Sequence, residues 1–431
     1  MALFLGIDLG TSYFKVGLFD AAGKLKGLGR VALEVTSPAP GQFELAVDKF
    51  WELLRRALHD ALVQAHAEPG EIAGLSYASQ ANTCVMLDQD DRPLTPFILW
   101  TDNRGEPVDA RALEFAASDT FRRTVGFEGI SGNWAVAKWN WFTRNKTAAA
   151  PAARRLMTIA DYLTFSLTGN RVGDASTAAF LGLYDLHASK WWAPALATFG
   201  LQESQLSMPL LPGTIAGRTT PSAQVRLGLP AGIPFAVGGL DHHVAALGAG
   251  LGRFADVSIS TGTVLATLAL VPSPDPRPHC YHGPHFERGY FYRLAFDANG
   301  AGRLETYQRE KAPELSLDTL LGQAAASSGV HGREVRLILD EIAATHAQLL
   351  DQVGRSAAMS RVVASGGGAR SPLWLQIKAD RMKVEIVTTT CSERGCLGAA
   401  MLAGVAAGKL GNLAEAADAM VHVGPIYAPR A

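Results

Sequence analysis

The stretch GIDLGTSYFK, which runs from Gly6 to Lys15, decides how this sequence folds. Its apolar start predicts a buried strand that delivers Asp8 to a tight turn. Gly10 has no side chain, so a ligand can approach the backbone there. Donors for phosphate oxygens follow at Thr11, Ser12 and Lys15. The carboxylate of Asp8 suits Mg²⁺, which prefers hard oxygen ligands. An ordinary β-turn explains the stretch equally well when it is taken alone.

Two more glycine-containing turns lie in the second half of the chain. Ser260-Thr261-Gly262-Thr263 is again a hydroxyl–glycine turn between apolar runs. One such turn in each half of the chain indicates a phosphate chain held from both sides of a cleft. The run Gly366-Gly367-Gly368 leads towards Ser371 and a helix, where a bulky ligand can approach closely and an anion is favoured. Taken singly, this run is as consistent with a plain turn, and it lacks the full dinucleotide fingerprint.

Asp241 is the candidate for the chemical step. It follows Gly238 and Gly239, which leave room for a substrate, and it opens a helix whose N-terminus favours a carboxylate. A positioned carboxylate that accepts a hydroxyl proton is what phosphoryl transfer to an alcohol needs. A helix N-cap explains an aspartate at this position equally well.

The order of predicted elements repeats along the chain. In the first half we expect strands at 3–8, 14–20 and 27–35, a helix at 48–66, and strands at 72–76 and 83–88. After a turn at 228–234, strands are expected at 256–260, 264–271 and 361–365, and helices at 241–251, 334–353 and 372–382. Strands alternating with helices indicate an α/β fold with mixed sheets. We therefore expect two domains, residues 1–235 and 236–431, that face a cleft.

Composition excludes several classes of protein. The 431 residues include 39 basic and 40 acidic side chains, so bulk charge offers no nucleic-acid groove and no membrane-binding surface. No stretch approaches the roughly 20 apolar residues that span a bilayer. Four scattered cysteines are too few for a disulfide framework, which favours a reducing, cytoplasmic compartment. His279, Cys280, His282 and His285 fit no paired zinc pattern, so we expect a loop there and not a metal site.

Taken together and in order, these motifs resemble the FGGY family of carbohydrate kinases, in a short, xylulokinase-like form. Residues 6–20 resemble its first phosphate loop, and residues 258–268 its second. Residues 362–382 and 392–408 are similar to its adenosine segment and closing helix. Gln80 and Asn82, then the Trp-x-Asp-x-Arg stretch from Trp100 to Arg104, are similar to its sugar-facing segments. The resemblance extends from residue 3 to about residue 408.

The resemblance implies two actin-like (ribonuclease H-like) ATPase domains on either side of a catalytic cleft, with ATP and Mg²⁺ as cofactors. Asp241 matches the catalytic base, and Asp8 and Asp241 are the carboxylates expected at the metal. The nucleotide contacts that it implies are Asp8, Gly10, Thr11, Ser12, Lys15, Thr263, Gly302, Gly367, Gly368 and Ser371. The sugar contacts that it implies are Gln80, Asn82, Trp100, Asp102 and Asp241. It also implies a small-molecule acceptor, which we expect to be a ketopentose such as xylulose.

This sequence departs from the family pattern at two points, and the resemblance leaves the acceptor and the oligomeric state undecided. His242 follows the catalytic aspartate, where Asn, Gln or Ala is common. The loop that usually carries Gly-Glu-Arg-x-Pro is missing, which puts the sugar in more doubt than the nucleotide. A kinase for a non-sugar or polyol acceptor, and a catalytically silent regulator of the same fold, therefore remain alternatives. A homodimer is compatible with the resemblance, but the sequence does not decide the oligomeric state.

Overall fold

Two mixed β-sheets organise the chain in the computed structural model, which describes residues 2–145, 147, 150–262, 264–298, 300, 302–355 and 359–430. The first sheet has the strand order β13-β14-β5-β1-β2-β3, and β15 also pairs with β5. Its strands are β1 (Leu3–Leu9), β2 (Tyr13–Phe19), β3 (Leu25–Ala32), β5 (Ile72–Ser79), β13 (Ile215–Arg218), β14 (Pro234–Ala236) and β15 (Gly239–Leu240).

The second sheet has the order β18-β19-β17-β16-β20-β21-β22. Its strands are β16 (Val257–Thr261), β17 (Leu265–Val271), β18 (Tyr281–Pro284), β19 (Phe291–Asp297), β20 (Arg361–Ser365), β21 (Glu385–Thr389) and β22 (Val423–Tyr427).

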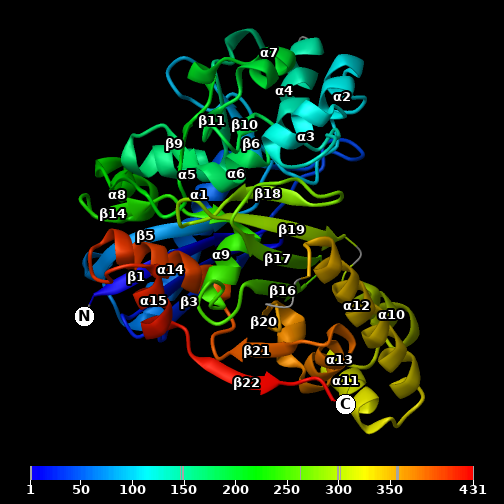
Figure 1. Ribbon diagram of the computed structural model, residues 1–431. Coiled ribbons are helices and arrows are strands. Elements are labelled where there is room, and N and C mark those ends of the chain that lie inside the picture. The colour runs from blue at the N-terminus through cyan, green and yellow to red at the C-terminus, as the bar shows by residue number, and fades with distance from the viewer. Residues whose placement is uncertain are drawn as a thin grey trace.

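Both sheets repeat one arrangement of strands. In the first, β3, β2 and β1 are antiparallel neighbours, and β5 and β14 continue the sheet parallel to β1. In the second, β19, β17 and β16 are antiparallel, and β20 and β21 continue parallel to β16. The repeat confirms the predicted α/β class with two units of the actin-like, ribonuclease H-like kind (Figure 1).

Helices cover the two large sheets, and the remaining strands of the described residues form three smaller sheets. The helices are α1 (Val47–Ala65), α2 (Ala110–Ala116), α3 (Asp119–Val125), α4 (Ala135–Arg144), α5 (Ile159–Thr168), α6 (Ala175–Ala179), α7 (Ala193–Phe199), α8 (Pro221–Leu227), α9 (Asp241–Gly248), α10 (Gly302–Lys311), α11 (Leu317–Ala326), α12 (Gly332–Gln352), α13 (Pro372–Met382), α14 (Arg394–Ala406) and α15 (Leu413–Met420). The smaller sheets contain β4 (Glu44–Leu45), β6 (Cys84–Leu87), β7 (Phe97–Ile98), β8 (Arg155–Thr158), β9 (Val172–Asp174), β10 (Tyr184–Asp185), β11 (Lys190–Trp191) and β12 (Met208–Leu210).

Apolar periodicity located the main elements. The predicted helix over 48–66 is α1, and its expected apolar face, from Phe50 to Ala61, is buried. The strand over 361–365 and the helix over 372–382 begin and end where they were predicted. The predicted division after residue 235 falls inside β14, a strand of the first sheet, while the second sheet begins at Val257. That division stays a prediction. Among the described residues, no helix combines the length and apolar character that crossing a bilayer requires.

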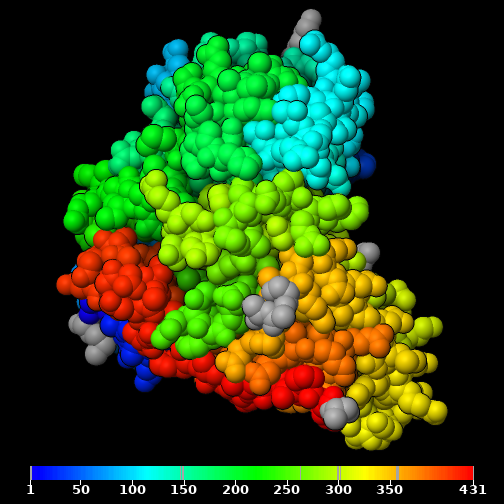
Figure 2. Space-filling view, viewed as in Figure 1, coloured from blue at the N-terminus to red at the C-terminus, as the bar shows by residue number. Residues whose placement is uncertain are grey.

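Helix α14 joins the two halves of the molecule. It packs against β1 and β5 of the first sheet and against α9. Figure 2 shows this C-terminal part of the chain, in red, against the blue N-terminal residues. Two glycines permit the close approach: a Cβ at Gly398 would lie 2.0 Å from the carbonyl oxygen of Val244 on α9, and one at Gly6 would lie 1.9 Å from that of Cys396. Helix α14 therefore fixes α9, and with it Asp241, relative to β1 and Asp8.

We expect Gly398→Val to lower the free energy of unfolding by about 3 kcal/mol or more, because backbone atoms leave no space for the new side chain. Ala406→Val, at a half-buried position of the same helix, is the matched control. Urea denaturation of both variants measures the effect. Equal stability of the two variants would contradict the close packing of α9 on α14.

Candidate active site

Strand register brings the two key carboxylates together. In the parallel pairs that flank β5, Asp8 of β1 and Gly239 of β15 are both partners of Ala78. Both strands end at the same edge of the sheet, where β1 leads into the first phosphate loop and β15 into α9. Asp241 is the first residue of α9 and is partly exposed, and its Oδ1 accepts a hydrogen bond from the backbone N–H of His242 at 2.7 Å.

A second chain of contacts fixes the start of α9. The hydroxyl of Ser176 accepts a hydrogen bond from the backbone N–H of Leu240 at 2.9 Å and donates one to Asp174 Oδ1 at 2.6 Å. Asp174 in turn accepts a hydrogen bond from the Tyr77 hydroxyl at 3.1 Å. These side chains are all buried, so they hold the residue before Asp241 without reaching the open space.

The charges around Asp8 do not balance. Burial raises the pKa of Asp8 to about 6; Lys15, 3.6 Å away, opposes the rise, and the carboxylates of Asp241 and Glu393 add to it. Lys15 Nζ also lies 3.0 Å from Glu393 Oε2. Burial opposes the charge of Lys15, but Asp8 and Glu393 outweigh that effect and raise the pKa of its ammonium. Three carboxylates around one ammonium leave a net negative charge, which is the environment that a divalent cation with bound phosphates would neutralise.

The first phosphate loop is held by residues predicted to contact the sugar. Gln80 Nε2 donates to the carbonyl oxygen of Gly10 at 3.2 Å, and Gln80 Oε1 accepts from the Thr83 hydroxyl at 3.0 Å. Trp100 Nε1 donates to Thr11 Oγ1 at 2.8 Å. Since Thr11 accepts that bond, its hydroxyl proton remains available to a ligand. Thr11 and Ser12 are exposed, as donors for phosphate oxygens must be.

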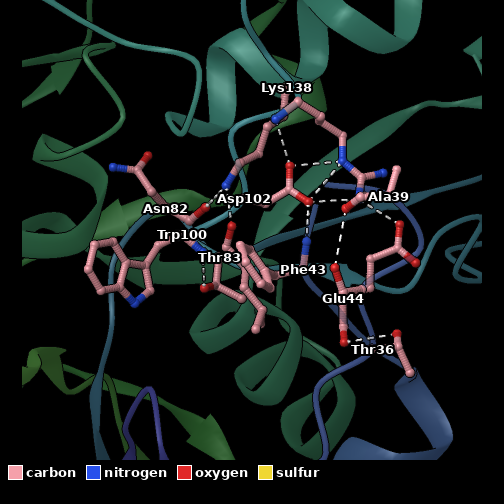
Figure 3. Close-up of polar contacts among 12 residues, drawn as sticks. Thr36, Ala39, Phe43, Glu44, Asn82, Thr83, Trp100, Asp102 and Lys138 are labelled. Atoms are coloured by element: carbon pink, nitrogen blue, oxygen red, sulfur yellow. Dashed lines mark hydrogen bonds and ion pairs between the residues drawn. The ribbon is translucent and has the colours of Figure 1, made fainter. Parts of the chain in front are cut away.

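Asp102 does not line the open space, contrary to the predicted sugar contact. Its side chain is 0% exposed. Asp102 Oδ2 accepts from the backbone N–H of Phe43 at 2.7 Å and from Arg104 Nη2 at 2.7 Å, and Arg104 continues to Glu44 (Figure 3). The sequence motif contains both the aspartate and the arginine, but only the folded structure shows that the two side chains form an ion pair. Gln80 is similarly buried, 3% exposed, and both of its polar atoms are engaged.

Asn82 and Trp100, like Asp241, are predicted sugar residues that remain partly exposed. Asn82 has a positive φ of 58°, a backbone conformation that asparagine tolerates better than most residues. Lys138, which sequence analysis did not single out, donates from its buried Nζ to the carbonyl oxygens of Asn82 at 3.0 Å and Leu99 at 2.6 Å. Burial lowers the pKa of Lys138 to about 8. A lysine in the middle of a helix gives no signal of this role in sequence.

Trp100→Phe is expected to reduce kcat/KM about three- to tenfold, the effect of losing one neutral hydrogen bond while the ring is retained. The bond to Thr11 joins the sugar-facing segment to the phosphate loop, so both substrates should be affected. Steady-state kinetics with the acceptor and the nucleotide varied in turn measures this. Trp141→Phe, at a partly buried tryptophan of α4, is the matched control. An unchanged kcat/KM for both substrates would contradict the coupling.

A cavity of about 670 Å³ lies beside the second sheet. Its lining includes Thr261, Gly262, Gly367, Gly368 and Ser371, all of which belong to the predicted nucleotide motifs around 260–263 and 366–371. The Ser371 hydroxyl caps α13 by accepting from the backbone N–H of Trp374 at 3.3 Å. Gly302 begins α10, which lines the cavity through Leu304 and Glu305. Thr263 lies outside the described residues.

The glycine run serves packing as well as the cavity. A Cβ at Gly366 would lie 2.4 Å from the carbonyl oxygen of Thr261, and one at Gly368 would lie 2.6 Å from Thr261 Cγ2. At Gly367 the nearest such atom is 4.0 Å away. Gly366 and Gly368 are thus required by the close approach of Thr261, and Gly367 is the one with open space.

Among the described residues, the histidine-rich segment takes part in no group of three or more possible metal ligands. Instead of the expected loop, it forms β18 with the turns on either side. His282 Nδ1 donates to the carbonyl oxygen of Gly126 at 2.7 Å, and its Nε2 accepts from Arg293 at 2.8 Å. His285 pairs with His243 at 2.8 Å. The bond from His282 to Gly126 joins the two halves of the chain, and the other two contacts lie within the second half.

Comparison with known proteins identifies the family. The model of the N-terminal domain of FGGY carbohydrate kinases matches residues 3–248, and that of the C-terminal domain matches residues 215–407. The chain belongs to the FGGY family of carbohydrate kinases. This FGGY kinase is therefore a phosphotransferase that acts on a sugar with ATP as the phosphate donor.

Three relatives illustrate the match. L-xylulose/3-keto-L-gulonate kinase of Escherichia coli is 25% identical, over 97% of this chain and 91% of its own length. Gluconokinase of Bacillus subtilis is 24% identical, over 96% of this chain and 89% of its own. The crystal structure of xylulose kinase from Lactobacillus acidophilus, with bound ligand, superposes with a TM-score of 0.89 at 20% identity, covering 100% of this chain and 94% of that one.

Proposed function

We propose that this FGGY kinase phosphorylates a terminal hydroxyl of a ketopentose such as xylulose. The observation that carries the proposal is the placement of Asp241 beside Asp8 and the first phosphate loop, with Trp100 bonded to that loop from the sugar-facing side. An acceptor lying against Trp100 would present a hydroxyl to Asp241 and to the phosphate in one arrangement.

Asp241 would take the proton of the acceptor hydroxyl as its oxygen attacks the γ-phosphorus. The proton moves to a carboxylate oxygen, the new P–O bond forms, and the bond to the leaving ADP oxygen breaks. Thr11, Ser12 and Lys15 would donate to the phosphate oxygens on which charge develops. The Ser176 and Asp174 contacts would keep Asp241 in position.

The residues present fit a magnesium ion. Asp8 would hold it, directly or through water, with Asp241 nearby, because these carboxylates lie in a region of net negative charge. The ion supplies charge neutralisation at the transferring phosphoryl group. This role for Asp8 is consistent with the effect of burial on its pKa, since the carboxylate lacks a full counter-charge.

A small neutral polyol suits the acceptor side better than an acidic sugar. The carboxylate of gluconate would need a free cation, but Lys138, which contacts the carbonyl oxygen of Asn82, and Arg104, which pairs with Asp102, are both buried and already partnered. The ring of Trp100 can lie against the C–H face of a polyol. The Asn82 amide already donates to the carbonyl oxygen of Phe180 at 3.2 Å and accepts from the backbone N–H of Ala135 at 3.0 Å, so it would offer a hydroxyl only its second N–H and a remaining lone pair. The relative named for L-xylulose supports a pentulose, and the relative named for gluconate marks the competing acceptor.

A coupled assay of ADP formation tests the proposal. D-xylulose, L-xylulose, ribulose, glycerol, erythritol, a hexulose and gluconate are compared at matched concentrations. We expect kcat/KM to be highest for one of the pentuloses. A preference for gluconate or a hexose would reject the pentulose, and nucleotide binding without turnover on any acceptor would favour a regulator of the same fold.

A further inference from the structure

Three buried side chains from three elements meet beneath the nucleotide cavity. Lys378 Nζ, on α13, donates to Thr261 Oγ1 at 2.5 Å, and His346 Nε2, on α12, lies 3.1 Å from the same oxygen. Lys378 Nζ also lies 4.6 Å from the ring centroid of Trp374. Thr261 ends β16 directly before Gly262, and Thr261, Gly262 and Trp374 all line the cavity. Lys378 thus contacts the side chain of Thr261, the residue directly before Gly262 in the second phosphate turn.

The charge of this lysine has no counterpart in the described part of the chain. Its pKa falls to about 7 because of burial, and no acidic side chain there contributes an opposing effect. Burial also lowers the pKa of His346 well below its usual range, and the nearby Lys378 adds to that, so the histidine is neutral. An ammonium has three N–H donors. Among the described residues, these N–H groups donate a hydrogen bond to Thr261 Oγ1.

Two more polar atoms of the cluster are unpaired. His346 Nδ1 and Trp374 Nε1 are buried and have no hydrogen-bond partner among the described residues. A buried cation without a counter-charge is costly, and an anion that arrives nearby reduces that cost. A polyphosphate bound at the turn formed by Thr261 and Gly262 would be such an anion.

We propose that Lys378 is a positioning residue that acts through Thr261, and that binding of a nucleotide polyphosphate in the cavity is coupled to uptake of one proton by Lys378. The proton passes from solvent to the neutral Nζ amine, and the resulting ammonium donates to Thr261 Oγ1 and favours the negative ligand. The groups that face Nζ are Thr261 from β16, His346 from α12 and the Trp374 ring from α13 itself. This inference rests on the proposed use of the cavity for ATP.

Calorimetry with ADP, with and without Mg²⁺, tests the coupling. Titrations at about pH 8.5 and about pH 6 are repeated in two buffers of different ionisation enthalpy, which gives the number of protons taken up. Lys378→Met keeps the length of the side chain and removes the charge. Lys383→Met, at an exposed lysine that follows the same helix, is the matched control.

In the wild type and in Lys383→Met we expect uptake approaching one proton per ADP at the higher pH and less at the lower pH. Lys378→Met should lose this difference and should bind ADP roughly tenfold more weakly at neutral pH, the order expected from one nearby buried charge. Its fold should persist, because a methionine suits a buried site better than an unpaired cation.

Equal proton uptake in Lys378→Met and wild type, or equal ADP affinity at neutral pH, would overturn the inference and leave the proposed function intact. If the wild type binds no ADP at all, both the inference and the nucleotide role of the cavity fail. A loss of affinity in Lys378→Met without a change in proton uptake would reduce the lysine to a packing role.

Discussion

Asp241→Asn is expected to lower sugar-dependent ADP formation by about 10² to 10⁴, the contribution typical of a positioned general base. The amide keeps the shape of the side chain and can still accept from the backbone N–H of His242, so the start of α9 should be unchanged. It cannot take the hydroxyl proton of the acceptor. The loss should therefore be in kcat, with little change in the KM of either substrate.

The control for Asp241→Asn is the same substitution at an aspartate outside the site. Asp256→Asn, at an exposed aspartate before β16, should keep full activity. Calorimetry with ADP should show the same affinity for Asp241→Asn as for the wild type. Turnover within threefold of wild type would mean that another group is the base, and lost nucleotide binding would mean that Asp241 mainly holds the metal and phosphates.

The parts of this molecule that sequence could predict are those with a local signal. Short apolar runs located β1, β2, β16 and β17, and helical periodicity located the buried face of α1. Glycine beside hydroxyl side chains marked the two turns for which we predict phosphate binding. These features depend on residues that are close together in the chain, so their pattern is visible without a structure.

The supporting contacts had no such signal. Asp102 was expected at the sugar but is neutralised by Arg104, and Lys138 and Lys378 were not singled out, although both are buried beneath the site. Whether a charged side chain is exposed or paired depends on residues distant in sequence. Glu393 is a further case, because only the packing of α14 on β1 brings it to Lys15.

Asp8→Asn is expected to stabilise the protein without ligand and to inactivate the kinase. The pKa of Asp8 is about 6 in the fold, above the ordinary value of 3.8. The folded state therefore disfavours the charged form, and this cost is fully present above about pH 6 and disappears as the pH falls below about 4. At neutral pH the substitution should raise the free energy of unfolding by about 2 kcal/mol.

The same charge is what a magnesium ion and bound phosphates would need, so turnover should fall by at least about 10² in Asp8→Asn. In the wild type, kcat/KM should decline as the pH falls through about 6, because protonated Asp8 is a poor ligand. Mg²⁺ with ADP should raise the Tm of the wild type more than that of Asp8→Asn, since the bound ion stabilises the ionised carboxylate of Asp8 in the folded state.

Thermal unfolding at about pH 7.5 and about pH 5, with and without Mg²⁺ and ADP, measures these effects beside the kinetics. Asp60→Asn, at an exposed aspartate of α1, is the control and should change neither Tm nor turnover. A lower Tm in Asp8→Asn at the higher pH would show that the carboxylate stabilises the fold through Lys15. A higher Tm with full activity would show that Asp8 is strained by burial but has no part in holding the metal.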